Sequence, residues 1–253
     1  MKLLLDAGNT RTKWAVADSN SDQLLDRGVL DRGANVSGLA QLSHFEIDSA
    51  WVSCVASQQV LTDLKQDVKD HFSLSLNEAV VEQEAAGMLN NYSDLGRLGV
   101  DRWVAALGAR SIYPRGALIV VDAGTAVTID LVSTANRFEG GVILPGFVTM
   151  HDALLGRTAG VESEFHQVSS VVGRNTSECV NAGAQFGLIG AVEKVVSEMS
   201  KSAMLGIDGG EPQILVMGGD AKAIIDGASM KVELQPDMIF NGLILLSNQQ
   251  VKK

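Results

Sequence analysis

The segment Leu3-Leu4-Leu5-Asp6-Ala7-Gly8-Asn9-Thr10 recurs later in the chain as Ile119-Val120-Val121-Asp122-Ala123-Gly124-Thr125-Ala126. The second copy begins about half a chain length after the first in a chain of 253 residues. Self-similarity at a fixed distance is typical of a repeated structural unit. The sequence therefore predicts two related lobes, each built around one copy of this segment.

Each copy is predicted to form a β-hairpin. An apolar strand leads into a turn of small residues, and a second apolar strand follows over residues 12–17 in the first copy and 126–132 in the second. A dinucleotide-binding site or P-loop would place a helix after its glycine-rich turn, whereas β-branched residues and period-two alternation favour a strand. The dinucleotide-binding fold is therefore disfavoured.

Strands and helices alternate through the rest of the chain, which is typical of an α/β protein. The spacing of apolar residues predicts helices over 57–72, 99–113, 176–199 and 238–247, with a further helix starting near residue 145. Strands are expected over 50–55, 138–144 and 213–217, and residues 87–98 are expected to form a loop. We place the boundary between an N-terminal lobe (1–115) and a C-terminal lobe (116–253) near residue 115.

Composition describes a soluble globular protein, with 46% hydrophobic and 20% charged residues. A formal net charge of −10 opposes binding to nucleic acid or to an anionic membrane. No apolar run approaches the roughly 20 residues that span a bilayer, so a cytoplasmic location is expected. Cys54 and Cys179 lack metal-ligand spacing and are expected to be buried free thiols. The four histidines are read as structural or surface residues: His44, His71, His151 and His166.

The turn that follows Asp6 contains the parts of a phosphate-binding loop. Gly8 lets backbone N–H groups approach an anion closely, Asn9 and Thr10 supply short polar donors, and the Asp6 carboxylate can hold Mg²⁺ directly or through water. Lys13 can add a positive charge. The alternatives are an ordinary tight turn and a solvated strand lysine. The second copy of the turn favours the phosphate-binding interpretation.

Two further glycine clusters remain open to two interpretations each. Gly218-Gly219-Asp220 follows a predicted strand, where it either admits a flat ligand or forms an ordinary strand-to-helix turn with Asp220 as the N-cap. The segment from Gly140 to Gly146 either brings backbone close to a substrate or only turns a strand into a helix.

Taken together, these segments resemble the type III pantothenate kinases over almost the whole chain. The resemblance rests on Asp-Ala-Gly-Asn-Thr at the N-terminus, Gly99-Val-Asp-Arg102, Asp122-Ala-Gly-Thr-Ala126, Gly140-Gly-Val-Ile-Leu-Pro-Gly146 and Gly218-Gly-Asp220, in that order. It implies the actin-like ATPase fold, in which two ribonuclease-H-like lobes with mixed β-sheets and flanking helices close around ATP. It also implies phosphorylation of the primary hydroxyl of pantothenate, the first step toward coenzyme A, with Mg²⁺ and a monovalent cation, K⁺ or NH₄⁺.

The same resemblance implies a role for individual residues. It places Asp122 on the monovalent cation, Asp101 as the proton acceptor, and Thr176 on the substrate across a homodimer interface. The ATP contacts that it implies are Asp6, Ala7, Gly8, Asn9, Thr10, Arg11, Thr12 and Lys13 from the first turn, with Thr125 from the second. The pantothenate contacts are Tyr92, Gly99, Val100, Asp101 and Arg102.

From position alone, Asp101 could equally be a carboxylate favoured by the dipole at a helix N-terminus, Arg102 a surface arginine and Tyr92 a loop residue packed on the core. Two rival functions also follow from this fold. One is a kinase of the same superfamily acting on a sugar, an N-acetylated sugar or a carboxylate. The other is a nucleotide-dependent regulatory or assembly protein, which an intact Asp101 and two intact Asp-Ala-Gly turns disfavour.

Overall fold

The computed structural model describes residues 1–30, 38–204 and 210–250. The chain divides into two compact units. Unit 1 comprises Met1–Pro114 and Asp237–Lys253, and unit 2 comprises Arg115–Pro236. The predicted boundary near residue 115 coincides with the first junction, whereas the C-terminal stretch, which we expected in the C-terminal lobe, belongs to unit 1.

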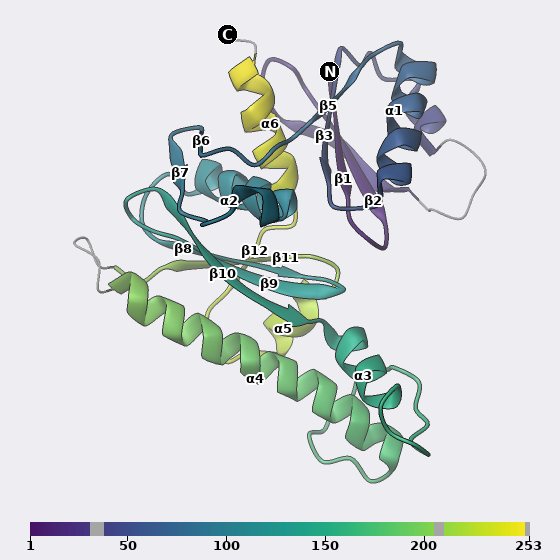
Figure 1. Ribbon diagram of the computed structural model, residues 1–253, viewed down its shortest axis with the longest axis vertical. Coiled ribbons are helices and arrows are strands. Elements are labelled where there is room, and N and C mark those ends of the chain that lie inside the picture. The colour runs from purple at the N-terminus through teal and green to yellow at the C-terminus, as the bar shows by residue number, and fades with distance from the viewer. Residues whose placement is uncertain (31–37, 205–209, 251–253) are drawn as a thin grey trace. The chain divides into compact units, whose positions relative to one another are not determined.

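Unit 1 contains a mixed five-stranded sheet in the order β3-β2-β1-β4-β5 (Figure 1). Its strands are β1 (Lys2–Ala7), β2 (Thr12–Ala17), β3 (Leu24–Leu30), β4 (Ser49–Cys54) and β5 (Leu76–Glu78). β1 pairs with β2 antiparallel and with β4 parallel. The hairpin predicted for the first copy of the repeated segment is confirmed.

One face of this sheet is covered by a helix that the sequence predicts. The helices of unit 1 are α1 (Gln58–Phe72), α2 (Val100–Ile112) and α6 (Met238–Gln250), with 3-10 turns at η1 (Gly38–Leu42) and η2 (Leu95–Arg97). Leu61 and Leu64 of α1 pack in one apolar cluster with Leu3, Leu5 and Val52 of the sheet. Side chains alternate along a strand, so the neighbours of these residues on β1 and β4 point to the other face of the sheet. That face is contacted by α2 and α6.

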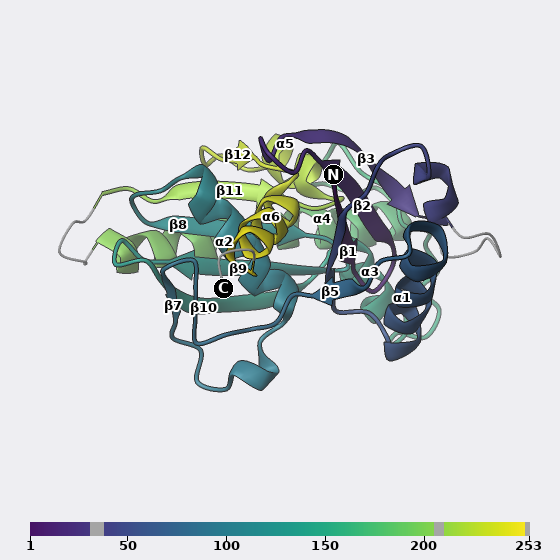
Figure 2. The same cartoon turned by 90° about the horizontal axis from the view of Figure 1, so that it is seen from above.

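Helix α6 belongs to unit 1 because it packs backbone to backbone against α2. A Cβ atom at Gly108 would lie 1.8 Å from the Met238 carbonyl oxygen, and one at Gly242 would lie 2.1 Å from the Val104 carbonyl oxygen. Figure 2 shows α6 lying beside α2. The buried Lys2 ammonium of β1 also donates to Asn248 Oδ1 at 2.6 Å near the end of α6.

The segment expected to be a loop, 87–98, is partly regular. β6 (Glu84–Ala85) and β7 (Met88–Asn90) form a tight antiparallel hairpin, and η2 follows. Ala86 and Gly87 make the turn with φ of 51° and 74°, a left-handed conformation that glycine adopts readily. Strands of two and three residues are too short to produce a visible period in the sequence.

Unit 2 is built on the second copy of the repeated segment. Five of its strands lie in the order β12-β11-β8-β9-β10. They are β8 (Leu118–Ala123), β9 (Ala126–Val132), β10 (Arg137–Pro145), β11 (Gln213–Met217) and β12 (Glu233–Leu234). β8 and β9 pair antiparallel, so the second predicted hairpin is also confirmed, and β11 runs parallel to β8.

The helices of unit 2 are α3 (Phe147–Leu155), α4 (Thr176–Met204) and α5 (Ala221–Gly227). The long helix α4 runs along the sheet (Figure 1), and its Leu188 and Val192 share an apolar cluster with Val121 and Ile129 of the hairpin. Within the described residues, no helix is both long and apolar enough to span a membrane.

Both cysteines are free thiols, as predicted. Their expected burial is wrong in part, because Cys54 is half-buried and Cys179 is exposed. Cys179 lies in the first turn of α4, on the side of the helix that faces solvent, while the neighbouring Val180 is buried.

Candidate functional site

The first turn places a carboxylate and an ammonium group side by side. Asp6 and Lys13 are paired residues on β1 and β2, so their side chains leave the same face of the sheet. Lys13 Nζ lies 4.0 Å from Asp6 Oδ2. The turn between them is closed by Gly8 N–H, which donates to the Arg11 carbonyl oxygen at 3.1 Å. Asn9, Thr10 and Arg11 are exposed at the turn, where they can meet a ligand in solution.

Asp6 sits in an environment that resists its ionisation. Burial raises its pKa from 3.8 to about 6, the nearby Lys13 ammonium opposes this shift, and the charge of Asp101 adds to it. Asp101 therefore acts electrostatically on the first turn, and the structure brings Asp6, Lys13 and Asp101 together within unit 1.

Asp101 lies in the first turn of α2, and its carboxylate is held by its own helix. Its Oδ1 accepts the Arg102 backbone N–H at 2.8 Å. A Cβ atom at Gly99 would lie only 2.6 Å from the same Oδ1, so the folded-back position of the carboxylate depends on glycine there. Burial raises the pKa of Asp101, with the Arg102 contacts opposing it. A partly desolvated carboxylate of this kind is a stronger base than one in water.

Arg102 and Tyr92 form a second group in unit 1. The Arg102 guanidinium carbon lies 5.6 Å from the centre of the Tyr92 ring, within range for a cation–π contact. Arg102 is 6% exposed, so it is not a surface arginine. Sequence reasoning missed Asn90, which is 2% exposed and whose Oδ1 accepts the Tyr92 backbone N–H at 3.0 Å. The sequence shows only an asparagine two residues before the tyrosine, and its burial becomes visible only in the structure.

In unit 2, Asp122 occupies the position that matches Asp6. Gly218 comes so close that a Cβ atom there would lie 2.6 Å from Asp122 Oδ1 and 2.2 Å from the Ala123 carbonyl oxygen. Its φ of +100° also favours glycine. Asp220 N–H donates to the same Ala123 carbonyl oxygen at 3.0 Å, and Asp220 is the N-cap of α5 without a side-chain capping bond. The cluster from Gly218 thus packs directly on the end of β8.

The second turn is supported by residues whose role the sequence left open. Gly146 N–H donates to the Thr125 carbonyl oxygen at 3.0 Å, and the Thr149 hydroxyl donates to the same oxygen at 2.7 Å. A Cβ atom at Gly146 would lie 2.0 Å from the Gly124 carbonyl oxygen. The segment ending at Gly146 therefore starts α3 and also fixes the Gly124–Thr125 turn, which leaves Thr125 exposed.

Thr176 is the first residue of α4 and is exposed. Glu178, two residues on, accepts the Arg174 N–H at 2.7 Å and orders the chain that enters this helix. Within unit 2 the structure places Thr176 near the 410 Å³ pocket lined by residues 166–170, 172–174 and 178, and not in the second hairpin.

A divalent cation would find one strong protein donor in the first turn. In the described part of the chain, no group of three or more His, Cys, Asp or Glu side chains is arranged to hold a metal. The lone Asp6 carboxylate fits Mg²⁺, which usually takes one or two carboxylates and otherwise water and phosphate oxygens. For a monovalent cation, Asp122 offers oxygen ligands, and any side chain at position 218 would crowd its Oδ1.

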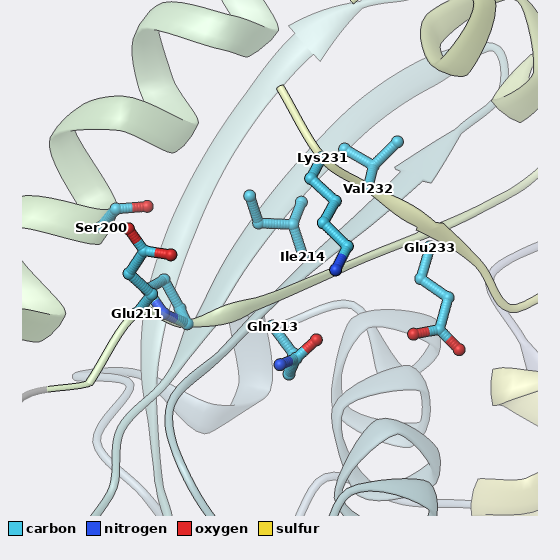
Figure 3. A pocket seen from close by; sticks show the side chains of 8 residues that line it. Ser200, Glu211, Gln213, Ile214, Lys231, Val232 and Glu233 are labelled. Carbon is cyan, nitrogen blue, oxygen red and sulfur yellow. The ribbon is translucent and has the colours of Figure 1, made fainter. Parts of the chain in front are cut away.

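A pocket of about 330 Å³ in unit 2 lies away from the predicted site residues (Figure 3). It is lined by Ser200, Glu211, Pro212, Gln213, Ile214, Lys231, Val232 and Glu233. These residues gather at the start of β11, whereas the Gly218 cluster follows the end of the same strand. The pocket is therefore separate from the predicted nucleotide-binding residues.

Comparison with known proteins identifies the relatives of this chain. Residues 2–198 match the family model for type III pantothenate kinases. A type III pantothenate kinase from Teredinibacter turnerae is 35% identical over 249 residues, covering 97% of this chain and 98% of the relative. One from Nitrosococcus oceani is 30% identical over 261 residues, covering 100% and 96%.

Solved structures with low sequence identity share the fold. A putative Baf family transcriptional activator from Campylobacter jejuni aligns with a TM-score of 0.59 at 18% identity, covering 98% of this chain and 99% of that one. A putative 2-dehydro-3-deoxygalactonokinase from Sinorhizobium meliloti aligns with a TM-score of 0.53 at 11% identity, covering 99% of each. The fold is the α/β fold of actin-like ATPases and sugar kinases, as the resemblance implied. With a matching family model and full-length relatives at 30% identity or more, the chain belongs to the type III pantothenate kinase family.

Proposed function

We propose that this enzyme transfers the γ-phosphoryl group of ATP to the primary hydroxyl of pantothenate, giving 4′-phosphopantothenate in the first step of coenzyme A biosynthesis. The observation that carries the proposal is the half-buried carboxylate of Asp101 in the first turn of α2, which has a raised pKa and whose charge acts on Asp6. The family relationship supplies the substrate.

Asp101 acts as the general base in this proposal. Phosphoryl transfer depends mainly on in-line positioning and charge neutralisation, but a hydroxyl nucleophile still has to lose its proton. An ionised carboxylate within hydrogen-bond reach accepts that proton and contributes about 10²–10⁴ in rate. Arg102 and Tyr92 are beside this group and would orient pantothenate through its carboxylate or amide and its apolar chain.

The turn from Asp6 to Lys13 would hold the phosphates of ATP, and Thr125 would contact the nucleotide. The Lys13 side chain is 31% exposed, so its ammonium group can reach an anion. Asp6 would hold Mg²⁺ directly or through water, and the ion when bound neutralises phosphate charge. Asp122, beside Gly218, would hold K⁺ or NH₄⁺.

We also propose a cytoplasmic homodimer in which Thr176 contacts the substrate of the partner subunit. Supporting this, unit 2 carries several exposed large apolar side chains near its α3 end and near the chain that enters α4. These are Ile143, Val148, Leu154, Val171 and Val172. Exposed apolar side chains that form one contiguous patch commonly mark protein contacts.

A coupled assay with Mg·ATP and K⁺ tests the function by offering pantothenate beside a panel of sugars, N-acetylated sugars and small carboxylates. We expect turnover of pantothenate alone. Turnover of a sugar without pantothenate would support the rival kinase, and nucleotide binding without turnover of any acceptor would support a regulatory protein.

The pH dependence should carry the signature of Asp101. The base works only when ionised, and burial raises its pKa above 3.8. Activity should therefore fall as the pH drops through this raised pKa, so that the acid limb of kcat/KM for pantothenate lies above the usual carboxyl range. Carboxyl ¹³C NMR of the ligand-free protein measures the titration of Asp101 directly, without a contribution from ATP. The Asp101 signal is assigned by its loss in Asp101→Asn. An Asp101 midpoint at or below 3.8 would contradict the prediction.

Cation selectivity should reflect Asp122. With the total salt held constant, we expect rates in K⁺ or NH₄⁺ to exceed those in Na⁺, because the larger ions are less costly to dehydrate. Asp122→Asn should reduce this dependence. Equal rates of the wild type in all three salts would remove the monovalent site from the proposal.

A further inference from the structure

Ser53 presents a buried hydroxyl whose purpose the fold alone does not explain. It lies in β4 and is 1% exposed. Its Oγ has no hydrogen-bond partner among residues 1–30, 38–204 and 210–250. Buried side-chain polar atoms are nearly always paired, because an unpaired one loses its bonds to water without replacement. A buried hydroxyl without a partner, if it lies beside a binding site, can gain its hydrogen bond when a ligand binds.

The position of Ser53 points to Asp6. The two residues are register partners in the parallel pair of β1 and β4, so their side chains leave the same face of the sheet from strands about 4.8 Å apart. Lys13 flanks Asp6 on the other side from β2. The face that carries all three is the one contacted by α2, the helix that begins with Asp101 in its first turn.

Asp6 has Lys13 as a cationic neighbour on β2, and the Ser53 hydroxyl on β4 has no hydrogen-bond partner in the described part of the chain. Lys13 Nζ is 4.0 Å from Asp6 Oδ2, beyond a normal hydrogen bond. A phosphate competes strongly for the same ammonium, since charge-assisted bonds to phosphate are short and strong. When Lys13 turns to the phosphates, Asp6 needs another group to fix its orientation. The Ser53 hydroxyl is the neutral donor on the adjacent strand.

We propose that Ser53 is a positioning residue of the phosphate site, whose hydroxyl donates a hydrogen bond to the Asp6 carboxylate when Mg·ATP is bound. The inference rests on the proposed function, since it takes the Asp6 turn as the phosphate site. In the ligand-free protein the Ser53 hydroxyl is buried without a hydrogen bond to any described residue, which lowers the stability of the fold. The bond to Asp6 forms only in the complex with Mg·ATP. Ser53 acts through Asp6 and touches neither substrate.

The two states give Ser53→Ala an unusual pair of expected effects. Ligand-free Ser53→Ala should melt at the same temperature as the wild type or higher, because no hydrogen bond is lost. Its KM for ATP should rise on the order of ten-fold, since a bond to a charged group is lost in the complex. The rise in melting temperature produced by Mg²⁺ with a non-hydrolysable ATP analogue should shrink in parallel. The KM for pantothenate should change little.

Two variants serve as controls. Ser247 is 4% exposed on α6, and its hydroxyl already donates to the Ile244 carbonyl oxygen at 2.7 Å. Ser247→Ala should leave the KM values for ATP and pantothenate unchanged. Its melting temperature should rise by no more than the higher helix propensity of alanine explains. Ser53→Thr keeps the hydroxyl but adds a buried methyl group, so it should melt lower than wild type while retaining a KM for ATP closer to wild type than Ser53→Ala.

The outcomes separate this inference from the proposed function. Lower ligand-free stability of Ser53→Ala would show a structural partner for the hydroxyl and would overturn the inference. So would an unchanged KM for ATP with an unchanged ligand-induced melting shift. If the wild type phosphorylates no pantothenate, the proposed function fails, while the melting shift with the ATP analogue still decides the role of Ser53. A wild type that shows neither turnover nor a melting shift would overturn both.

Discussion

Replacing Asp101 with asparagine should lower kcat/KM for pantothenate by about 10²–10⁴, the usual contribution of a positioned base. The asparagine oxygen can still accept the Arg102 N–H that Asp101 Oδ1 accepts at 2.8 Å, so the start of α2 should keep its geometry. What the variant lacks is the group that takes the proton. Retained turnover would remove Asp101 from the role of base.

The stability of the same variant should move in the opposite direction. Burial raises the pKa of Asp101, so folding favours the protonated form and the ionised form destabilises the folded state. Asparagine removes this penalty at pH values above the folded-state pKa. The free energy of unfolding should thus be equal to or above wild type near neutral pH, and the difference should vanish as the pH falls through the folded-state pKa. Urea unfolding of both proteins, near neutral pH and at a pH below the folded-state pKa, measures this difference.

The matched control for this experiment is Asp94→Asn. Asp94 is an exposed N-cap of η2 and accepts the Gly96 N–H at 3.0 Å, so the exchange is chemically the same at another helix start in unit 1. Activity should stay at the wild-type level. An equal loss of activity in both variants would show that the effect of Asp101→Asn is not specific to its site.

Replacing Gly242 with alanine should destabilise the protein by about 3 kcal/mol or more, because overpacking of a close helix contact forces the backbone apart. The added Cβ atom would lie 2.1 Å from the Val104 carbonyl oxygen, and backbone cannot rotate away as a side chain can. Since Val104 lies one turn after Asp101 on α2, activity should fall together with stability. Urea unfolding and the kinase assay measure the two effects.

The control for Gly242→Ala is a helical glycine with open space around it. Gly190 is exposed on α4, and a Cβ atom there would meet nothing within 4 Å. Gly190→Ala should raise the free energy of unfolding by about 1 kcal/mol through helix propensity. If the two variants were equally stable, the close contact between α2 and α6 would not hold in solution.

The hairpins were predictable because their determinants are local. In each copy an apolar strand, an Asp-Ala-Gly turn and a second apolar strand follow one another within a short stretch, and the pairings of β1 with β2 and of β8 with β9 connect neighbours in sequence. The long helix α4 was found for a similar reason, since many consecutive residues repeat one apolar spacing.

Elements that depend on distant partners were missed. β3 is an edge strand whose Leu25 and Val29 are exposed, so the sequence Leu24–Leu30 shows no alternation between buried and exposed positions. The seven-residue α5 and the two-residue β12 are too short to show a period. The assignment of α6 to unit 1 required the contacts of Gly108 and Gly242, which no local pattern reveals.

Residue types in the site were predictable, but their supports were not. Asp6 and Asp101 stand out as carboxylates at a strand end and a helix start. Thr149 supports the Thr125 turn from a position far along the chain, and Ser53 is brought beside Asp6 only by the pairing of β1 with β4. Asn90 contacts the nearby Tyr92 backbone, but its burial depends on the fold, and nothing in the sequence around these residues sets them apart.

Because unit 1 is assembled from two separate stretches, its folding is tied to the order of synthesis. The first 114 residues leave the ribosome early, but α6 follows only after the whole of unit 2 has been made. During that interval the groove on α2 at Gly108 lacks the helix that fills it, and α2 carries Asp101. A polypeptide that ended before residue 238 would contain every proposed site residue but lack the helix that packs against α2 in unit 1. The rate of translation through unit 2 thus sets how long the incomplete unit 1 is accessible to chaperones and proteases.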